Sequence, residues 1–487
     1  MGLLFNSAFS VGLLFLTSFI IYLFDRFWVK PQRLRSKLRS QGLRGPSPSF
    51  LLGNIPDFIK FQPKDIKALT EDGEATHDWA RFTFPLFDHW TKQYNFALGT
   101  YQVVYITDPH LAKEISLSTS LKLGMPFFLQ KNSETLLGKG ILTSDGEFWA
   151  HQRKTITLEF YVDKVKNLVH IMLDSANKLI NTWEIEIEKQ RETANIKVDE
   201  DLQSFASIVI SETLFGQSNS KVINELQSRF KRLERAMKTP ILVGGIPAYD
   251  YFYKWLLFRY IPTKSNLEKW RLKKEIHSQI MSIVNEQSSN VDVLQTIING
   301  AKMSALGPAA VEQLIVDNCK NVYVAGLEST VNTTAWTLML LAMHPEWQDR
   351  ARPEVAEVCG ESLPNATKLG KMKVLTSVIQ EALRLNPPVP FIARETLEDM
   401  KFGDLEIPKG VGVWVAVMSL HHDPELWGLD PSKFNPDRFA NGIGSACKIP
   451  QVYIPFGNGP HICAGQLFAM LEIKALLTII LQIFLFP

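Results

Sequence analysis

The sequence predicts a mainly helical domain with small β-sheets, preceded by one transmembrane helix. Two long helical segments that end at prolines, residues 311–347 and 368–388, predict central helices. Between Phe391 and Val417, short apolar stretches alternate with turn residues, which predicts short strands. The uncharged run from Leu3 to Phe24 would be roughly 33 Å long as a helix, enough to cross a bilayer.

The N-terminal segment predicts a transmembrane anchor at residues 1–25, a basic and proline-rich hinge at 26–50, and a globular domain at 51–487. A cleaved signal peptide would show a basic start, a shorter apolar run and a small-residue cleavage site, and none is evident. A buried core helix is the remaining alternative. The positive-inside rule predicts that the domain after the run is cytosolic, because seven basic residues follow the run. They are Arg26, Lys30, Arg33, Arg35, Lys37, Arg39 and Arg44.

Composition narrows the class of protein. The chain has 487 residues, of which 46% are hydrophobic and 21% charged, so it is typical of globular proteins rather than disordered ones. A net charge of only +2 argues against a dedicated nucleic-acid binder. Its four cysteines do not form a disulfide scaffold in so long a chain, and a reducing compartment is the simpler interpretation.

The stretch Tyr453–Gly465, "YIPFGNGPHICAG", presents one cysteine on a short loop. Gly457 and Gly459 permit a close approach to something flat or bulky, and Pro460 stiffens the loop. Cys463 then precedes a helix, whose backbone N–H groups are expected to favour the thiolate. Such a sulfur is a metal ligand or a nucleophile. No neighbouring His/Asn pattern completes a cysteine hydrolase, so a ligand is favoured.

Three further patterns each have a plain structural alternative. Glu381 and Arg384 share a helix face, as many surface ion pairs do. The stretch "AGLEST", residues 325–330, indicates either close helix packing or room for a ligand beside proton donors. Trp149 and Arg153 lie one helical turn apart and indicate either a shared anion or a cation–π contact.

Together, and in this order, these patterns resemble the cytochrome P-450 family. "FGNGPHICAG" matches its haem-binding loop, "EALR" its Glu-x-x-Arg helix and "FNPDRF" the segment that follows. "AGLEST" matches the oxygen-binding groove and "WAHQR" the Trp-x-x-x-Arg haem contact. The resemblance covers nearly the whole chain and implies the cytochrome P-450 fold.

The resemblance also implies roles for the site residues. Cys463 would be the proximal ligand of the iron of haem b, and Glu328, Ser329 and Thr330 the catalytic residues that relay protons during activation of O₂. Glu381, Arg384 and Arg438 would form a structural cluster. The remaining residues that would bind the cofactor are Trp149, Arg153, Ala325, Gly326, Arg394, Phe456, Gly457, His461 and Gly465.

Closer likeness to the plant group of gibberellin-oxidising enzymes rests on "FWAHQRKTITLEFYVDKVK", "DNCKNVYVAGLEST", "KFGDLEIPKGVGVWV" and "LHHDPELWG". It implies hydroxylation or epoxidation of a hydrophobic metabolite, such as a gibberellin-type diterpenoid, another hormone or a terpenoid. Electrons would come from NADPH through a membrane-bound cytochrome P-450 reductase. The expected location is the endoplasmic reticulum membrane, with one span and the catalytic domain in the cytosol.

Three departures from the family pattern leave alternatives open. His461 stands where the family usually has Arg, and Ser329 replaces the more usual Thr. The chain ends at Pro487, where family members usually continue into further strands, so we expect those strands to be missing. The alternatives are a haem-thiolate enzyme that does not oxygenate, or an inactive truncated paralogue that only binds haem or ligand.

Overall fold

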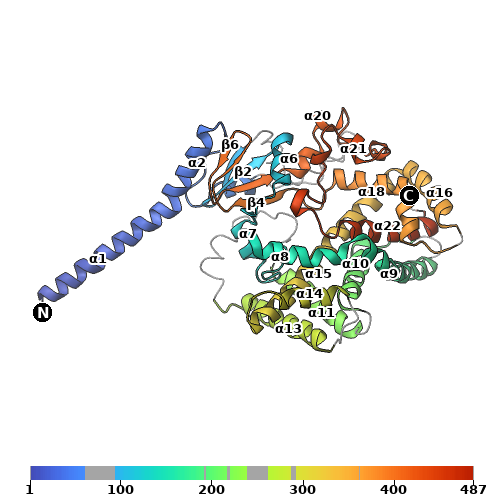
Figure 1. The fold of residues 1–487 in the computed structure, drawn as a ribbon, viewed down its shortest axis with the longest axis horizontal. Coiled ribbons are helices and arrows are strands. Elements are labelled where there is room, and N and C mark those ends of the chain that lie inside the picture. The colour runs from blue at the N-terminus through green and yellow to red at the C-terminus, as the bar shows by residue number, and fades with distance from the viewer. Residues whose placement is uncertain are drawn as a thin grey trace.

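The computed structural model describes residues 2–60, 94–190, 194–216, 220–237, 261–286, 292–360 and 362–485. Helices form most of the domain, and the strands lie at the end where the N-terminal helix joins it (Figure 1). The predicted fold class, mainly helical with small sheets, is therefore confirmed.

The long helix α15 (Pro308–Met343) is the centre of the helical part. Gly307 and Pro308 begin it, and it ends before Pro345, which opens α16 (Pro345–Cys359). It packs against α10 (Val198–Phe215), α14 (Asp292–Lys302), α18 (Lys373–Leu385) and α22 (Gln466–Ile483). Because neighbours surround it, α15 is buried on most sides, as its apolar sequence predicted.

Shorter helices complete the domain around this centre. Their bounds are α3 Ile55–Lys60, α6 Pro109–Leu117, α7 Phe127–Ser133, α8 Gly146–Ile156, α9 Val162–Lys189, α11 Ser220–Met237, α13 Lys264–Glu286, α17 Ala366–Lys371, α19 Val417–His421, α20 Pro424–Trp427 and α21 Ile443–Ala446.

The larger sheet joins segments that are distant in the sequence. Its strand order is β1 (Tyr94–Leu98), β2 (Tyr101–Ile106), β7 (Gly412–Val415), β4 (Ile392–Thr396) and β3 (Leu123–Gly124). Strands β2 and β7 pair in parallel, with Val104 opposite Val413, and the other pairs are antiparallel. A second sheet pairs β5 (Met400–Phe402) with β6 (Leu405–Ile407). The sheet thereby carries β4 to the rim of the cavity described below.

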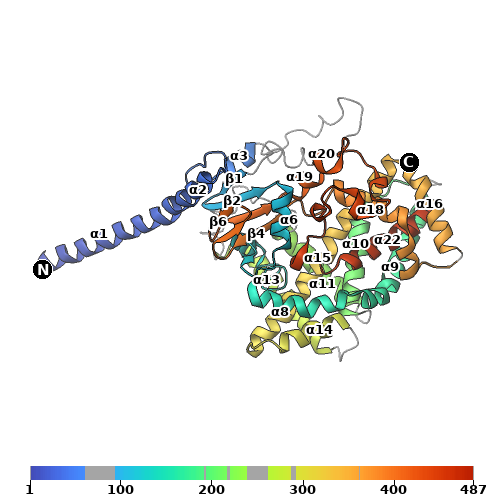
Figure 2. The same ribbon diagram turned by 45° about the horizontal axis from the view of Figure 1, so that its top comes forward.

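The N-terminal helix α1 (Gly2–Phe24) projects away from the domain in both ribbon views (Figures 1 and 2). It continues through a π-helical turn (Asp25–Val29) into α2 (Lys30–Ser40), which buries Arg35 and Leu38 beside the first two strands. The basic segment is thus helical as far as Ser40, and irregular chain begins only after it.

Within the described ranges, two helices are long and apolar enough to cross a membrane, Ser10–Ser40 and Gln466–Ile483. The second is α22, of which 67% is buried in the domain. It is therefore a core helix, and α1 is the segment compatible with a membrane anchor.

Candidate functional site

A cavity of about 470 Å³ lies between the loop 453–465 and helix α15. The structure brings twelve of the predicted site residues to its wall: Trp149, Arg153, Ala325, Gly326, Ser329, Thr330, Arg394, Phe456, Gly457, His461, Cys463 and Gly465. Of the predicted catalytic and cofactor-binding residues, Glu328 lies outside this wall. The site therefore assembles from separate parts of the chain.

The cysteine loop is shaped by backbone that only glycine adopts easily. Gly457 has a φ of +72° and Gly459 a φ of +61°. A Cβ at Gly459 would lie 2.6 Å from the Ser116 carbonyl oxygen, so a side chain there would also clash. The Cys463 N–H donates to the Phe456 carbonyl oxygen over 2.7 Å and closes the loop. The sulfur is consequently held on a rigid turn immediately before α22.

The expected preference of Cys463 for the thiolate is not an intrinsic property of the loop. Burial raises the pKa of the Cys463 thiol, and the Gly465 N–H and the Arg153 charge lower it by less. The residue is exposed only because it opens onto the cavity. Burial thus opposes the effect of the helix N-terminus on the Cys463 thiol, and a metal ion at the sulfur would favour the thiolate.

Cationic and aromatic side chains gather on one rim of the cavity. The rings of Trp149 and His461 stack with centroids 4.0 Å apart. Burial, followed by the charges of Arg394 and Arg153, lowers the pKa of His461 to about 3. Burial also lowers the pKa of Arg394 to about 10, although Asp145 opposes this shift. The rim is therefore an environment prepared for anions.

These features fit haem. Its two propionates would pair with the cations of the rim, and its flat face would lie against the glycine loop. The Cys463 sulfur faces the same cavity and is a ligand that iron accepts from proteins. Arg153, Arg394 and His461 would hold the propionates and Cys463 the iron.

The structural cluster assembles behind the cysteine loop. Arg384 donates to both Glu381 carboxylate oxygens over 2.7 Å, and both side chains are fully buried. Arg438 approaches the same carboxylate at 3.4 Å, and the Asn435 N–H donates to it. The surface ion pair considered from the sequence is thus excluded, and the pair instead fixes segment 431–438 against α18.

His421 connects this cluster to the cysteine loop, and its role was not anticipated from the sequence. Its Nε2 accepts the Ile454 N–H over 3.1 Å, and its Nδ1 lies 3.2 Å from the Arg384 carbonyl oxygen. Burial and the neighbouring Arg384 lower the pKa of His421 to about 3, so the ring stays neutral. The only signal in the sequence was its place in "LHHDPELWG".

Across the cavity, the turn of α15 with the sequence "AGLEST" serves both close helix packing and the cavity wall. A Cβ at Gly326 would lie 2.6 Å from the Ile210 side chain of α10, so this glycine serves close packing. The Ser329 hydroxyl faces the cavity and donates to the Ala325 carbonyl oxygen over 2.8 Å. Thr330 is buried on the same wall, against the carboxyl group of Glu472. The turn therefore provides both space and hydroxyl groups.

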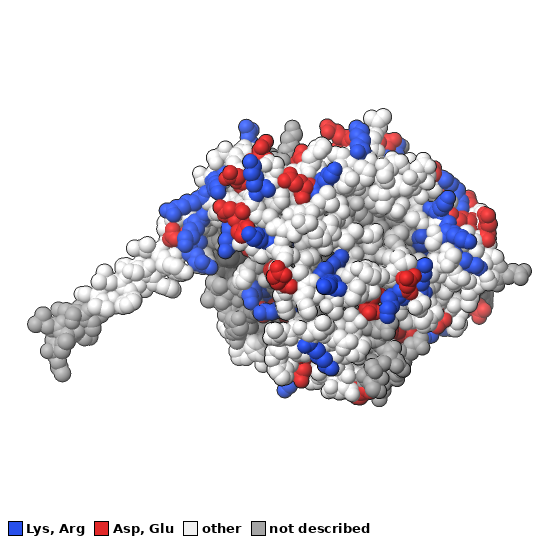
Figure 3. All heavy atoms as spheres, in the orientation of Figure 1, with Lys and Arg blue, Asp and Glu red and all other residues white. Residues whose placement is uncertain are grey.

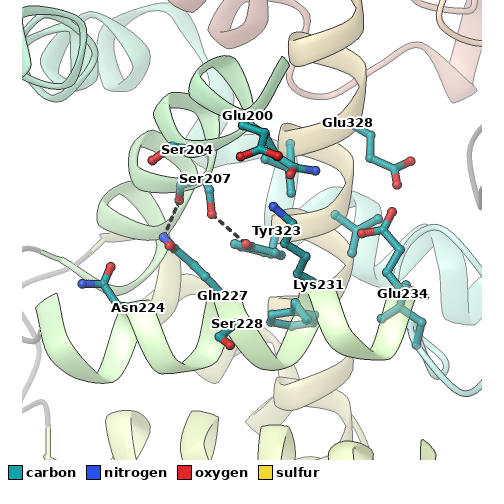
Figure 4. Close-up of a pocket in the computed structure, with 15 residues that line it drawn as sticks. Glu200, Ser204, Ser207, Asn224, Gln227, Ser228, Lys231, Glu234, Tyr323 and Glu328 are labelled. Carbon is teal, nitrogen blue, oxygen red and sulfur yellow. Dashed lines mark hydrogen bonds between the residues drawn. The ribbon is translucent and has the colours of Figure 1, made fainter. Parts of the chain in front are cut away.

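Glu328 points to the opposite side of α15, into a separate polar pocket of about 220 Å³ between α10, α11 and α15. Figure 4 shows its carboxyl group directed toward that of Glu234, with Lys231, Glu200 and Tyr323 around the same space. Burial, and then the hydrogen bond and charge of Glu234, raise the pKa of Glu328 to about 8. Glu328 therefore holds a proton near neutral pH.

A cysteine on a glycine loop, a rim of cationic side chains and a turn of α15 that carries hydroxyl groups line one cavity, and this combination is typical of haem-thiolate proteins. The comparisons with known proteins agree. The model of the cytochrome P450 family matches residues 76–487. The chain belongs to this family, and it is a monooxygenase.

Three of its relatives are plant proteins. It is 43% identical to cytochrome P450 714C2 of Oryza sativa subsp. japonica, over 96% of this chain and 90% of the relative. It is 38% identical to cytochrome P450 714B3 of Zea mays, over 95% and 88% of the two chains. It is 36% identical to cytochrome P450 714A2 of Arabidopsis thaliana, over 99% and 93%.

Proposed function

We propose that the protein hydroxylates or epoxidises a gibberellin-type diterpenoid, using O₂ and electrons that NADPH supplies through a membrane-bound reductase. The observation that carries the proposal is the cavity itself, which places an apolar wall above Cys463. The side chains that line this wall include Leu137, Ile141, Val389 and Phe391. Apolar walls with few polar groups select hydrophobic ligands, and the resemblance to gibberellin-oxidising enzymes supports the diterpenoid class.

Haem b bound through Cys463 would supply the oxygen-activating chemistry, because a thiolate ligand increases electron density at iron. The chain itself would hold and move protons. Ser329 presents its hydroxyl to the cavity, and Glu328 stores a proton in the polar pocket behind the same turn. Since the two face opposite sides of α15, transfer between them requires a rotamer change of Glu328 or an intervening water.

The anchor supports a location at the endoplasmic reticulum membrane with the domain in the cytosol. Helix α1 carries no charge from Gly2 to Phe24, and α2 adds Lys30, Arg33, Arg35, Lys37 and Arg39 directly after it. Figure 3 shows basic side chains gathered where the projecting helix meets the domain. This charge distribution favours a cytosolic flank.

The test uses the full chain in membranes with a plant cytochrome P450 reductase. Reduction under carbon monoxide should give the strongly red-shifted Soret band of a thiolate-ligated haem. Gibberellins and their diterpenoid precursors should then shift the Soret band of the oxidised protein, and NADPH should yield products heavier by one oxygen atom. Turnover of other terpenoids but not of gibberellins would overturn the substrate class and leave the monooxygenase assignment standing.

A further inference from the structure

The loop 137–143, between α7 and α8, forms part of the cavity wall without being a helix or strand. Leu137, Ile141 and Leu142 contribute side chains to the wall. The backbone N–H groups of such a loop have no ladder partners, so their hydrogen bonds must come from elsewhere. The position of the loop therefore depends on whatever supplies those bonds.

The N–H groups of Leu137, Gly138 and Thr143 donate to nearby backbone carbonyls, and three side chains of α15 accept from those of Lys139, Ile141 and Leu142. The Lys139 N–H donates to Asp317 Oδ2 over 2.8 Å. The Ile141 N–H donates to Asn318 Oδ1 over 3.0 Å, and the Leu142 N–H to Asn321 Oδ1 over 2.8 Å. Asn321 also donates through Nδ2 to the Leu137 carbonyl oxygen over 2.8 Å. We call Asp317, Asn318 and Asn321 the loop clamp.

The loop clamp contains a buried charge pair. Lys320 Nζ lies 2.7 Å from Asp317 Oδ1, and the two side chains are only 3% and 4% exposed. Burial lowers the pKa of Lys320, and the Asp317 carboxylate opposes this shift. A buried ion pair seldom stabilises a fold more than apolar residues of the same volume, so its benefit lies in fixing one arrangement. Here that arrangement is the approach of the loop to α15.

The loop itself is fitted to the clamp. Gly138 has a φ of +67°, and a Cβ at this position would collide with the Asp317 carboxylate. A Cβ at Gly140 would collide with the Asn321 side chain. The backbone therefore approaches α15 more closely than any other residue type allows at these two positions.

We propose that Asp317, Asn318 and Asn321 are positioning residues that set the register of loop 137–143 and thereby determine which hydrophobic molecules the cavity admits. The geometry of the clamp stands by itself, and the consequence for selectivity rests on the proposed function. A shift of the loop by one residue would exchange which of its apolar side chains reach the cavity. In the sequence, the clamp is indicated only by "DNCK", in which the acid Asp317 and the base Lys320 lie one helical turn apart.

The first measurement follows amide hydrogen exchange in Asn318→Leu and Asn321→Leu. Both substitutions keep the volume and remove the acceptor, so exchange across residues 139–142 should accelerate by roughly 5-fold for the loss of about 1 kcal/mol. Thr334→Val is the matched control, because the Thr334 hydroxyl is buried on the same helix but donates only within it, to the Thr330 carbonyl oxygen. Unchanged exchange in both clamp variants would overturn the proposal. This readout does not require haem.

The second measurement compares binding of imidazole with that of a biphenyl-substituted imidazole, monitored through the Soret band. We expect the ratio of the two dissociation constants to change by roughly 5-fold in Asn318→Leu, whose side chain is outside the cavity wall, and to stay at the wild-type value in Thr334→Val. Asn321 lines the cavity itself, so Asn321→Leu is used for the exchange measurement alone. Faster loop exchange with an unchanged ratio would show that the clamp does not determine selectivity.

The double variant Asp317→Leu with Lys320→Met distinguishes the effect of the clamp on the position of the loop from its effect on the stability of the protein. Replacing a buried pair by apolar residues of similar volume should leave the unfolding temperature near that of the wild type. The Lys139 N–H nevertheless loses its acceptor, so the ligand ratio should still change. A wild-type ratio in this stable double variant would reduce the clamp to a stabilising role and overturn the proposal. A wild type without a thiolate–haem Soret band would instead contradict the proposed function.

Discussion

Two carboxyl groups on either side of the cavity, Glu381 and Glu328, have opposite electrostatic environments. Behind the cysteine loop, on what we call the proximal side, Glu381 is fully buried between Arg384 and Arg438. His421, beside them, stays neutral because its pKa is lowered to about 3. Across the cavity, on what we call the distal side, Glu328 of α15 faces the carboxyl group of Glu234 and has a pKa of about 8. The charges around Glu381 are therefore fixed by ion pairs, whereas Glu328 keeps a proton that can be exchanged near neutral pH. The difference matches the roles proposed above, a rigid scaffold behind Cys463 and a store of protons behind α15.

The largest expected effect breaks the proximal side at its centre. Cys463→Ala should abolish the thiolate–haem Soret band of the reduced carbon monoxide complex, because no other cysteine lines the cavity in the described part of the chain. Cys319→Ala, Cys359→Ala and Cys447→Ala should retain the band. A band that survives in Cys463→Ala would refute the assignment of the ligand.

The second prediction contrasts a buried pair with an exposed one. Glu381→Ala leaves Arg384 uncompensated in the interior and should lower the free energy of unfolding by about 3–5 kcal/mol. Arg350→Ala breaks a bidentate pair with Asp437 whose side chains are about half exposed, and should cost about 1 kcal/mol or less. Thermal unfolding measures both losses. An equal loss of free energy of unfolding in the two variants would contradict a structural role for the buried pair.

The third prediction concerns proton delivery on the distal side. Ser329→Ala removes the hydroxyl that faces the cavity, and product formed per NADPH consumed should fall by roughly 10- to 100-fold as electrons are diverted to peroxide. Ser329→Thr keeps the hydroxyl and limits its rotamers, so coupling should match or exceed that of the wild type. Equal coupling in all three proteins would exclude Ser329 from the relay.

The fourth prediction uses the pKa of Glu328, which burial and Glu234 raise from 4.5 to about 8. Between these pH values the folded state holds more protons than the unfolded state, so this group's contribution to stability falls as the pH rises from 4.5 toward 8. Glu328→Gln should therefore flatten the decline of the free energy of unfolding between pH 5 and pH 8, by roughly 1–4 kcal/mol. Glu147 is exposed and provides the control Glu147→Gln, and equal profiles in the two variants would refute the raised pKa of Glu328.

The smallest expected effect sharpens the description of the rim. His461→Arg would place a fixed, always charged donor beside Trp149, where the histidine ring now stacks. Haem loss to an excess of apomyoglobin should slow by roughly 2- to 5-fold, equivalent to about 0.5–1 kcal/mol. Faster haem loss would indicate that the stacked histidine fits the rim better than arginine.

Features that depend on close neighbours in the chain could be predicted from the amino-acid sequence. The glycine loop around Cys463, the helix faces of α15 and α18 and the uncharged α1 follow from local spacing, because helix geometry and the conformational freedom of glycine act within a few residues. The resemblance of the motifs to the cytochrome P450 family was sufficient to identify twelve residues that line the cavity.

How those elements face one another depends on packing between distant parts of the chain. Spacing places Glu328 and Ser329 side by side, but the packing of α15 on α10 and α11 turns Glu328 away from the cavity and toward Glu234. The loop clamp likewise joins residues that lie far apart in the sequence. Local spacing fixes the angle between side chains on one helix, whereas the rotation of that helix depends on neighbours from the rest of the chain.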